Sequence, residues 1–123
     1  MTTRRWMIAV AVVALLLTGA RLVYLWWHYR SLAAMHASRE VNFARQAQQY
    51  ERKHDWCAQQ FAIAALGSDS DRSATWEALA TSSGATAHDL RRLAEHASRI
   101  KRKYEHAARR PWLPVAPDPP PPE

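Results

Sequence analysis

The chain has 123 residues, a mass of 14.0 kDa, a formal net charge of +6 and a single cysteine. This length allows one small domain and excludes a large enclosed active site. The positive charge favours anionic partners, either nucleic acid or phospholipid headgroups, without choosing between them. Because Cys57 is alone, an intramolecular disulfide is excluded, while a disulfide between two chains stays open.

The N-terminal segment is apolar from Trp6 to Leu17, and apolar residues resume after Arg21 as far as Trp27. As a helix, the stretch from Trp6 to Trp26 spans about 30 Å, which is the thickness of the hydrocarbon core of a bilayer. The aromatic residues at its end then lie where an interfacial belt belongs. We therefore interpret residues 1–27 as a transmembrane anchor, in which Arg21 must snorkel to the interface or find a partner.

A cleaved signal peptide is the competing interpretation of the same segment. Arg4 and Arg5 would form its basic region, and Thr18-Gly19-Ala20 would form a small-residue cleavage site. We favour the uncleaved anchor because apolar residues continue beyond Arg21. A short N-terminal tail before the only apolar segment is typical of a signal-anchor, so we expect a single pass of the bacterial inner (cytoplasmic) membrane with the C-terminal part outside the cytoplasm.

Residues 28–66 are predicted to form an outgoing helix, since they contain no Gly or Pro and are rich in good helix formers. A weak inward stripe recurs at helical spacing. Its members are Ala33, His36, Glu40, Phe43, Ala47, Tyr50, His54, Cys57, Phe61 and Ala64.

Residues 67–71 form the only compact turn signal in the middle of the chain, and residues 72–110 are predicted to form a returning helix. The polar stretch at 81–86, which includes Gly84, should weaken or kink this helix without ending it. A coiled-coil seam is predicted along the returning helix from residues that alternate by three and four positions. It comprises Trp76, Leu79, Leu90, Leu93, Ala97, Ile100 and Tyr104.

Arms of equal length bring the end of the returning helix back to the membrane, together with a cluster of basic residues. A merely solvated basic helix face would explain the same charges. The candidates for contact with the membrane interface are Arg21, Trp26, Trp27, Arg109, Arg110 and Trp112.

Pro111 is predicted to end the returning helix, because it has no amide proton and disfavours helical geometry at the residue before it. Residues 111–123 are then an extended, disordered proline-rich tail. We expect Trp112 and Leu113 to pack on the base of the hairpin or at the membrane interface, and the chain after Val115 to stay mobile. The predicted fold class is thus all-α: a transmembrane helix, a long antiparallel two-helix hairpin and this tail.

The C-terminal sequence from Lys103-Tyr104-Glu105 through Pro111-Trp112-Leu113-Pro114-Val115 to Pro117-Asp118-Pro119-Pro120 resembles a signature of small single-pass membrane proteins of planctomycete-type bacteria. Arg4-Arg5-Trp6-Met7-Ile8 resembles the start of the same proteins, whereas the middle matches only in composition. The resemblance implies a bacterial membrane-anchored helical protein. It brings no activity, cofactor or catalytic residue with it.

Candidate chemistry is sparse in this sequence. His54 and Cys57 lie one helical turn apart, as metal ligands do, but a zinc site needs four donors and a helix–helix contact explains the pair as well. The three glycines form no phosphate-binding loop. We therefore predict no enzyme, no catalytic residue, no metal and no cofactor.

Two functional classes remain. In the first, the protein is a membrane-anchored structural or interaction subunit whose partners are the lipid bilayer and either another copy or another helical membrane protein. In the second, a basic helix binds nucleic acid at the cytoplasmic face, which needs the opposite topology. Its phosphate contacts would be Arg91, Arg92, Arg99, Lys101, Arg102 and Lys103.

Overall fold

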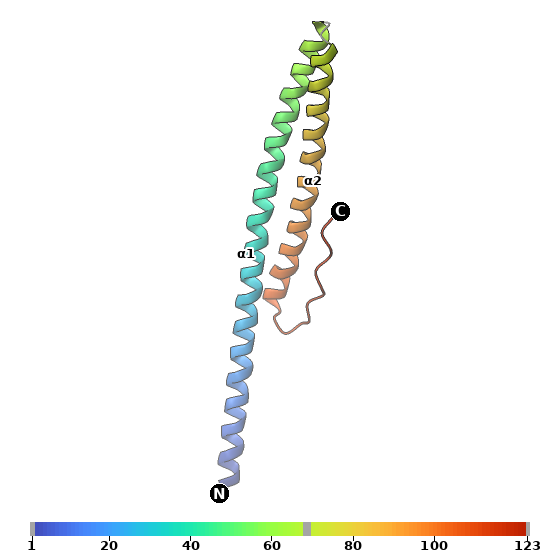
Figure 1. Ribbon diagram of the computed structural model, residues 1–123. Coiled ribbons are helices and arrows are strands. Elements are labelled where there is room, and N and C mark those ends of the chain that lie inside the picture. The colour runs from blue at the N-terminus through green and yellow to red at the C-terminus, as the bar shows by residue number, and fades with distance from the viewer. Residues whose placement is uncertain (1, 68–69, 123) are drawn as a thin grey trace.

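The computed structural model describes residues 2–67 and 70–122, and its regular structure consists of two α-helices (Figure 1). Helix α1 is Thr2–Leu66 and helix α2 is Ser70–Arg109. The two helices run antiparallel and pack against each other, and the described residues contain no strand. The prediction of an all-helical chain with two packed helices is confirmed.

Helix α1 is much longer than its partner, with 65 residues against 40 in α2. At 1.5 Å per residue, α1 is about 97 Å long and α2 about 60 Å. The N-terminal part of α1, blue in Figure 1, therefore extends beyond the hairpin without a partner helix. The predicted anchor and outgoing arm form one uninterrupted helix, because no Gly-Pro or polar break separates them.

The connection between the helices follows Gly67. The amide of Gly67 donates to the carbonyls of Ile63 and Ala64, at 3.2 and 3.1 Å, which closes the last turn of α1. The predicted turn at 67–71 falls partly on residues 68 and 69, which lie outside the described residues. Helix α2 begins at Ser70 and has Asp71 in its first turn, where a negative charge complements the helix dipole.

The polar stretch in α2 stays helical through Gly84. Its hydroxyl groups bond back to carbonyls of the preceding turn, so their polar atoms are satisfied inside the helix. Ser83 donates to the carbonyls of Leu79 and Ala80, at 2.7 and 3.0 Å, and Thr86 donates to that of Ser82 at 2.9 Å. The prediction of one long helix through residues 81–86, rather than two separate helices, is confirmed.

The core of the hairpin is a narrow seam of small side chains. Because a buried Ala offers only one methyl group, each contributes on the order of 1 kcal/mol of apolar burial. The buried hydrophobic residues are Ala33, Ala47, Cys57, Ala80, Ala87, Ala97, Ile100 and Ala107. Such a core brings two backbones close together but stabilises the pair only modestly.

The first half of the predicted α2 seam differs from the structure by one position. Leu79, predicted to face α1, is 37% exposed, whereas Ala80 beside it is 8% exposed. Ser83 and Ala87 continue the buried row. The physical reason is close approach: small side chains face α1 here, and the larger Leu79 is turned outward.

After Arg109 the chain leaves the helix at Arg110-Pro111. The amide of Arg110 donates to Ala107 and that of Leu113 to Arg110, each at 3.1 Å, which forms a compact reversal. The remaining residues, without helix or strand, run back alongside α2 (Figure 1). The sequence predicted a mobile tail here, whereas the structure gives it specific contacts with α2.

Candidate functional site

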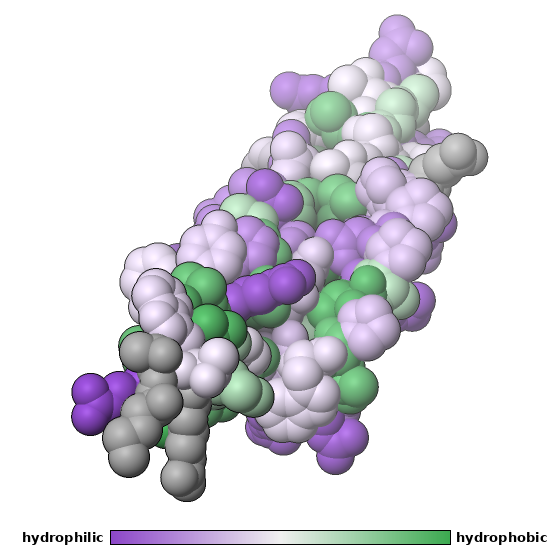
Figure 2. Space-filling model, turned by 90° about the horizontal axis from the view of Figure 1, so that it is seen from below, coloured by the Kyte–Doolittle hydropathy of each residue, from purple (hydrophilic) through white to green (hydrophobic). Residues whose placement is uncertain are grey.

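The unpaired part of α1 exposes its large apolar side chains on every side. Trp6, Ile8, Leu15 and Leu17 are all well over half exposed. In length and composition, α1 is a helix that can cross a membrane, and none of its most apolar stretch is buried inside the protein. Figure 2, which looks along the molecule from below, shows hydrophobic side chains in green reaching its surface. Nothing in the described chain covers this segment.

The six candidates for the membrane interface are all exposed in the structure: Arg21, Trp26, Trp27, Arg109, Arg110 and Trp112. Trp26 is covered on one side by the guanidinium of Arg30, which lies 5.1 Å from the centre of its ring. Trp112 is 67% exposed. Of its two predicted positions, the structure therefore does not show packing on the hairpin base.

Aromatic contacts fix the position along α1 at which α2 ends. The ring of Tyr104 stacks on those of Tyr29 and His36, with centroids 6.1 and 5.9 Å away. Tyr29 follows Trp27 by two residues, or about 3 Å of helix rise. The base of the hairpin thus begins where the apolar segment ends, as equal arms predicted.

A second set of contacts holds the C-terminal segment on α2. Lys103 forms an ion pair with Asp118 through Nζ and Oδ1, 2.5 Å apart. The hydroxyl of Tyr104 donates to Oδ2 of the same carboxylate at 2.8 Å. The ammonium group of Lys103 also lies 5.4 Å from the centre of the Tyr104 ring. We call Lys103, Tyr104 and Asp118 the tail clamp.

The electrostatics of the tail clamp agree with its geometry. The hydrogen bond from Lys103 lowers the pKa of Asp118, against the smaller opposing effect of desolvation. Burial, followed by the hydrogen bond to Asp118, raises the pKa of Tyr104 to about 12. Burial and the nearby Arg39 lower the pKa of His36. At neutral pH the Asp118 carboxyl is therefore ionised and the Tyr104 phenol keeps its proton.

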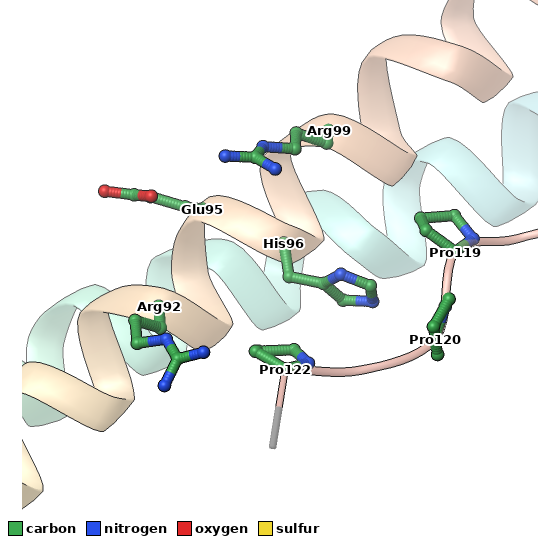
Figure 3. Close-up of a pocket in the computed structure, with 7 residues that line it drawn as sticks. All are labelled: Arg92, Glu95, His96, Arg99, Pro119, Pro120 and Pro122. Atoms are coloured by element: carbon green, nitrogen blue, oxygen red, sulfur yellow. The ribbon is translucent and has the colours of Figure 1, made fainter.

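Beyond the clamp, prolines of the tail line a shallow groove on α2. Figure 3 shows the His96 ring extending from α2 towards Pro120 and Pro122, whereas Glu95 points away from the tail. The groove has a volume of about 290 Å³ and is open to solvent. Its lining residues are Arg92, Glu95, His96, Arg99, Pro119, Pro120 and Pro122.

The residues of the predicted stripes on the two helices differ in burial. On α1, Ala33, His36, Ala47 and Cys57 are buried and Tyr50 is exposed; Glu40, Phe43, His54, Phe61 and Ala64 are partly buried. On α2, Ala97 and Ile100 are buried, while Trp76, Leu90, Leu93 and Tyr104 are partly buried.

Several basic residues on α2 are paired within the chain. Arg91 forms an ion pair with Glu51, and Lys101 pairs with Glu40 across the hairpin at 3.2 Å. Lys103 pairs with Asp118. Arg91, Lys101 and Lys103, which were predicted as phosphate contacts, therefore already have acidic partners.

His54 and Cys57 do not converge on a common site. The His54 Nδ1 atom lies 2.8 Å from the carbonyl oxygen of Ala80, which makes it a hydrogen-bond donor across the hairpin. Cys57 is 1% exposed, which leaves its thiol out of reach of a second folded chain. Within residues 2–67 and 70–122, no group of three His, Cys, Asp or Glu side chains is arranged to hold a metal ion.

Asp118 is the functional candidate that the sequence interpretation missed. The sequence feature that could have indicated its role is an isolated acid between two prolines, in a tail that follows a basic helix. Tyr104 and His36 were assigned to packing faces, but the stacking of the Tyr104 ring on those of Tyr29 and His36 was not predicted. Such contacts depend on where α2 ends relative to α1, which no local pattern states.

Comparison with known proteins adds no further constraint: no family model, curated protein or solved structure matches the chain.

Proposed function

We propose that this protein is an uncleaved single-pass membrane protein that holds a two-helix hairpin at the bilayer surface and associates with a second copy through it. The observation that carries the proposal is the unpaired apolar part of α1, which is exposed on all sides. Burying such a surface in lipid removes it from water at a favourable free energy of about 25 cal/mol per Å². The position of Tyr104 beside Tyr29 supports a hairpin that starts directly at the membrane.

Self-association is supported by the contrast between a small core and an exposed distal patch. We define the distal patch as Trp56, Ile63, Leu66 and Leu79, all exposed near the end of the hairpin farthest from the N-terminus. Trp56 meets Trp76 edge-on at 5.1 Å, so the patch continues across both helices. Two copies anchored in one bilayer carry their patches at the same height, which favours a parallel pair. Such a pair adds the large apolar contacts that the alanine seam lacks.

In this proposal the hairpin lies outside the cytoplasm, as the signal-anchor interpretation requires, and the tail is an extended proline-rich segment at its base. The resemblance to planctomycete-type membrane proteins agrees with this arrangement. The nucleic-acid alternative has less support, because Arg91 and Lys101 are paired with acids of α1.

The anchor is tested by extracting membranes with carbonate. We expect the wild-type chain to stay in the pellet with Met1 or Thr2 as its first residue. Val12→Asp combined with Leu16→Asp should release it, since each charge costs about 3 kcal/mol at the centre of a membrane helix. Ala58→Asp combined with Ala62→Asp, at exposed hairpin positions with the same spacing, is the matched control. A soluble product that begins at Arg21 would show a cleaved signal peptide instead.

Orientation is tested by fusing alkaline phosphatase to the C-terminus, since this enzyme is active only outside the cytoplasm. We expect an active fusion, and an inactive one would reverse the topology and reopen the nucleic-acid alternative.

Self-association is tested by crosslinking in membranes. Trp56→Ser with Ile63→Ser should reduce the dimer, whereas Met35→Ser, which removes an exposed apolar side chain nearer the base, should not. An unchanged dimer would remove the distal patch from the proposal.

A further inference from the structure

The tail clamp is built as a receptor for an anionic group. One oxygen of the Asp118 carboxylate accepts from the Lys103 ammonium and the other from the Tyr104 hydroxyl. An ammonium and a phenol are both hydrogen-bond donors at neutral pH, so together they suit any anion with two adjacent oxygens. A phosphate diester has the same pair of oxygens and a single negative charge.

The donors of the clamp are held in place independently of the tail. The Tyr104 ring is stacked between helices on Tyr29 and His36, and Ala107 one turn further along α2 is buried. Lys103 lies over the Tyr104 ring through a cation–π contact. Removing Asp118 would therefore leave a positively charged site still facing outward.

The clamp is accessible for exchange. The side chain of Lys103 is 22% exposed and that of Asp118 is 43% exposed, so solvent and its solutes reach the ion pair. Asp118 belongs to a segment without helix or strand, whereas both donors belong to α2. The acceptor is thus the partner that can leave, and the donors are the partners that stay.

The clamp also lies at the right height to meet lipid headgroups. Tyr104 contacts α1 between Tyr29 and His36, which are about 3 and 14 Å beyond Trp27 by helix rise. The headgroup layer extends about 5 to 7 Å outside the hydrocarbon core. A lysine ammonium at this position lies within one Debye length, about 10 Å, of anionic headgroups.

We propose that Lys103 and Tyr104 form a binding site for the phosphate of an anionic phospholipid headgroup, and that Asp118 occupies this site in cis when such lipids are scarce. The inference rests on the proposed membrane anchor. In a neutral bilayer the carboxylate holds the tail against α2. In an anionic bilayer a headgroup phosphate replaces it, and the segment from Pro117 to Pro122 is released from the groove at His96.

The experiment follows the tail in the intact protein, embedded in nanodiscs of defined lipid. A nitroxide is attached to Pro121→Cys, an exposed position in the tail. The native Cys57 should not react, because it is buried. In phosphatidylcholine we expect an immobilised spectrum, and adding phosphatidylglycerol should cause loss of the immobilised component. Asp118→Asn should be mobile in both lipids, whereas Glu105→Gln, which alters an exposed acid of α2 outside the clamp, should behave as wild type.

Each contrary result has a distinct meaning. A spectrum that does not change with lipid composition, in protein that inserts correctly, would overturn the headgroup site and leave the membrane anchor intact. Protein that fails to insert into either nanodisc would overturn the proposed anchor itself. Release by inorganic phosphate in neutral nanodiscs, as complete as that by phosphatidylglycerol, would overturn the lipid assignment in favour of a free anion site. Lys103→Gln tests the donor and should abolish the lipid response.

Discussion

The two parts of α1 belong to one helix but have opposite relations to the rest of the molecule. In the N-terminal part, large apolar side chains such as Leu15 and Leu16 are exposed all round the helix. In the part that pairs with α2, burial recurs at helical spacing and falls mainly on small residues such as Ala33 and Ala47. The most hydrophobic part of the chain is therefore the part on which no other element of the described chain packs.

This difference shows that apolar content and tertiary packing are separate properties. A helix that is apolar all round needs an apolar solvent, which a bilayer supplies. A helix with one narrow alanine stripe needs a second helix at close range, and large side chains would hold that helix away. The hairpin therefore depends on a few close contacts between its helices, whereas the apolar part of α1 packs against no other element of the described chain.

The largest effect that separates the two parts is expected for Ile100→Asp. Ile100 is the largest buried aliphatic side chain of the hairpin. Placing a charge in this buried, apolar seam is costly, so we expect a loss of about 3 kcal/mol or more and an unfolded hairpin. Circular dichroism in nanodiscs should show loss of helix from the hairpin while the chain remains resistant to carbonate.

Leu79→Asp is the control for that experiment. The sequence placed Leu79 on the same seam, but the structure turns it outward. We expect a clearly smaller loss of stability than for Ile100→Asp. Equal losses from the two variants would restore the predicted seam and contradict the observed register.

A smaller effect is expected where the helices come closest, at His54 and Gly84. His54→Ala removes the hydrogen bond to the Ala80 carbonyl and should cost about 1 kcal/mol. In wild type, a methyl group on Gly84 would lie 3.2 Å from His54 Nδ1, which offsets the gain of about 1 kcal/mol in helix propensity.

The two positions should therefore be coupled. We expect Gly84→Ala to be nearly neutral in wild type and stabilising by about 1 kcal/mol when His54 is already Ala. Thermal unfolding of the four proteins of this double-mutant cycle measures the coupling. Purely additive effects would show that the close approach has no energetic consequence.

The smallest expected effect is a pH dependence confined to the base of the hairpin. The pKa of Asp118 is lowered from 3.8, so its contribution to tail docking is present above 3.8 and is lost as pH falls through the lowered value. Burial in the hairpin lowers the pKa of His36 from 6.5, so its contribution to hairpin packing is present above 6.5 and weakens in acid, whereas the docked Asp118 acts in the opposite direction on this pKa. The pKa of Tyr104 is raised to about 12, so its contribution is present below 10 and is lost as pH rises through about 12. The charged or titratable groups facing these three are Tyr29, Arg39, His96 and Lys103.

Tail docking should thus be fully present between about pH 3.8 and 10, the ordinary pKa values of Asp118 and Tyr104. The amide NMR shift of Asp118 in the full-length protein reports this directly. Asp118→Asn should remove most of the acid transition, and Tyr104→Phe should remove the alkaline one. A transition that persists unchanged in both variants would place the titration elsewhere, while the apolar part of α1 should show none.

Sequence by itself determined the local features of this protein. Helix propensity between His28 and Leu66 and the absence of Gly and Pro there are properties of the chain alone. The apolar run from Trp6 likewise indicates a membrane-sized helix without reference to any partner. Pro111 ends α2 by its covalent structure, and the helix stops two residues before it, at Arg109.

Only the tertiary structure decided which residues face each other. Whether Leu79 or Ala80 faces α1 depends on how closely the helices approach, and both choices satisfy a spacing of three and four residues. The tail clamp depends on a reversal at Arg110-Pro111 that carries Asp118 back to Lys103 and Tyr104. Contacts of this kind join residues that are far apart in sequence or on opposite sides of a turn. These contacts stabilise the protein only after the helices have packed, so the sequence pattern of a single segment cannot predict them.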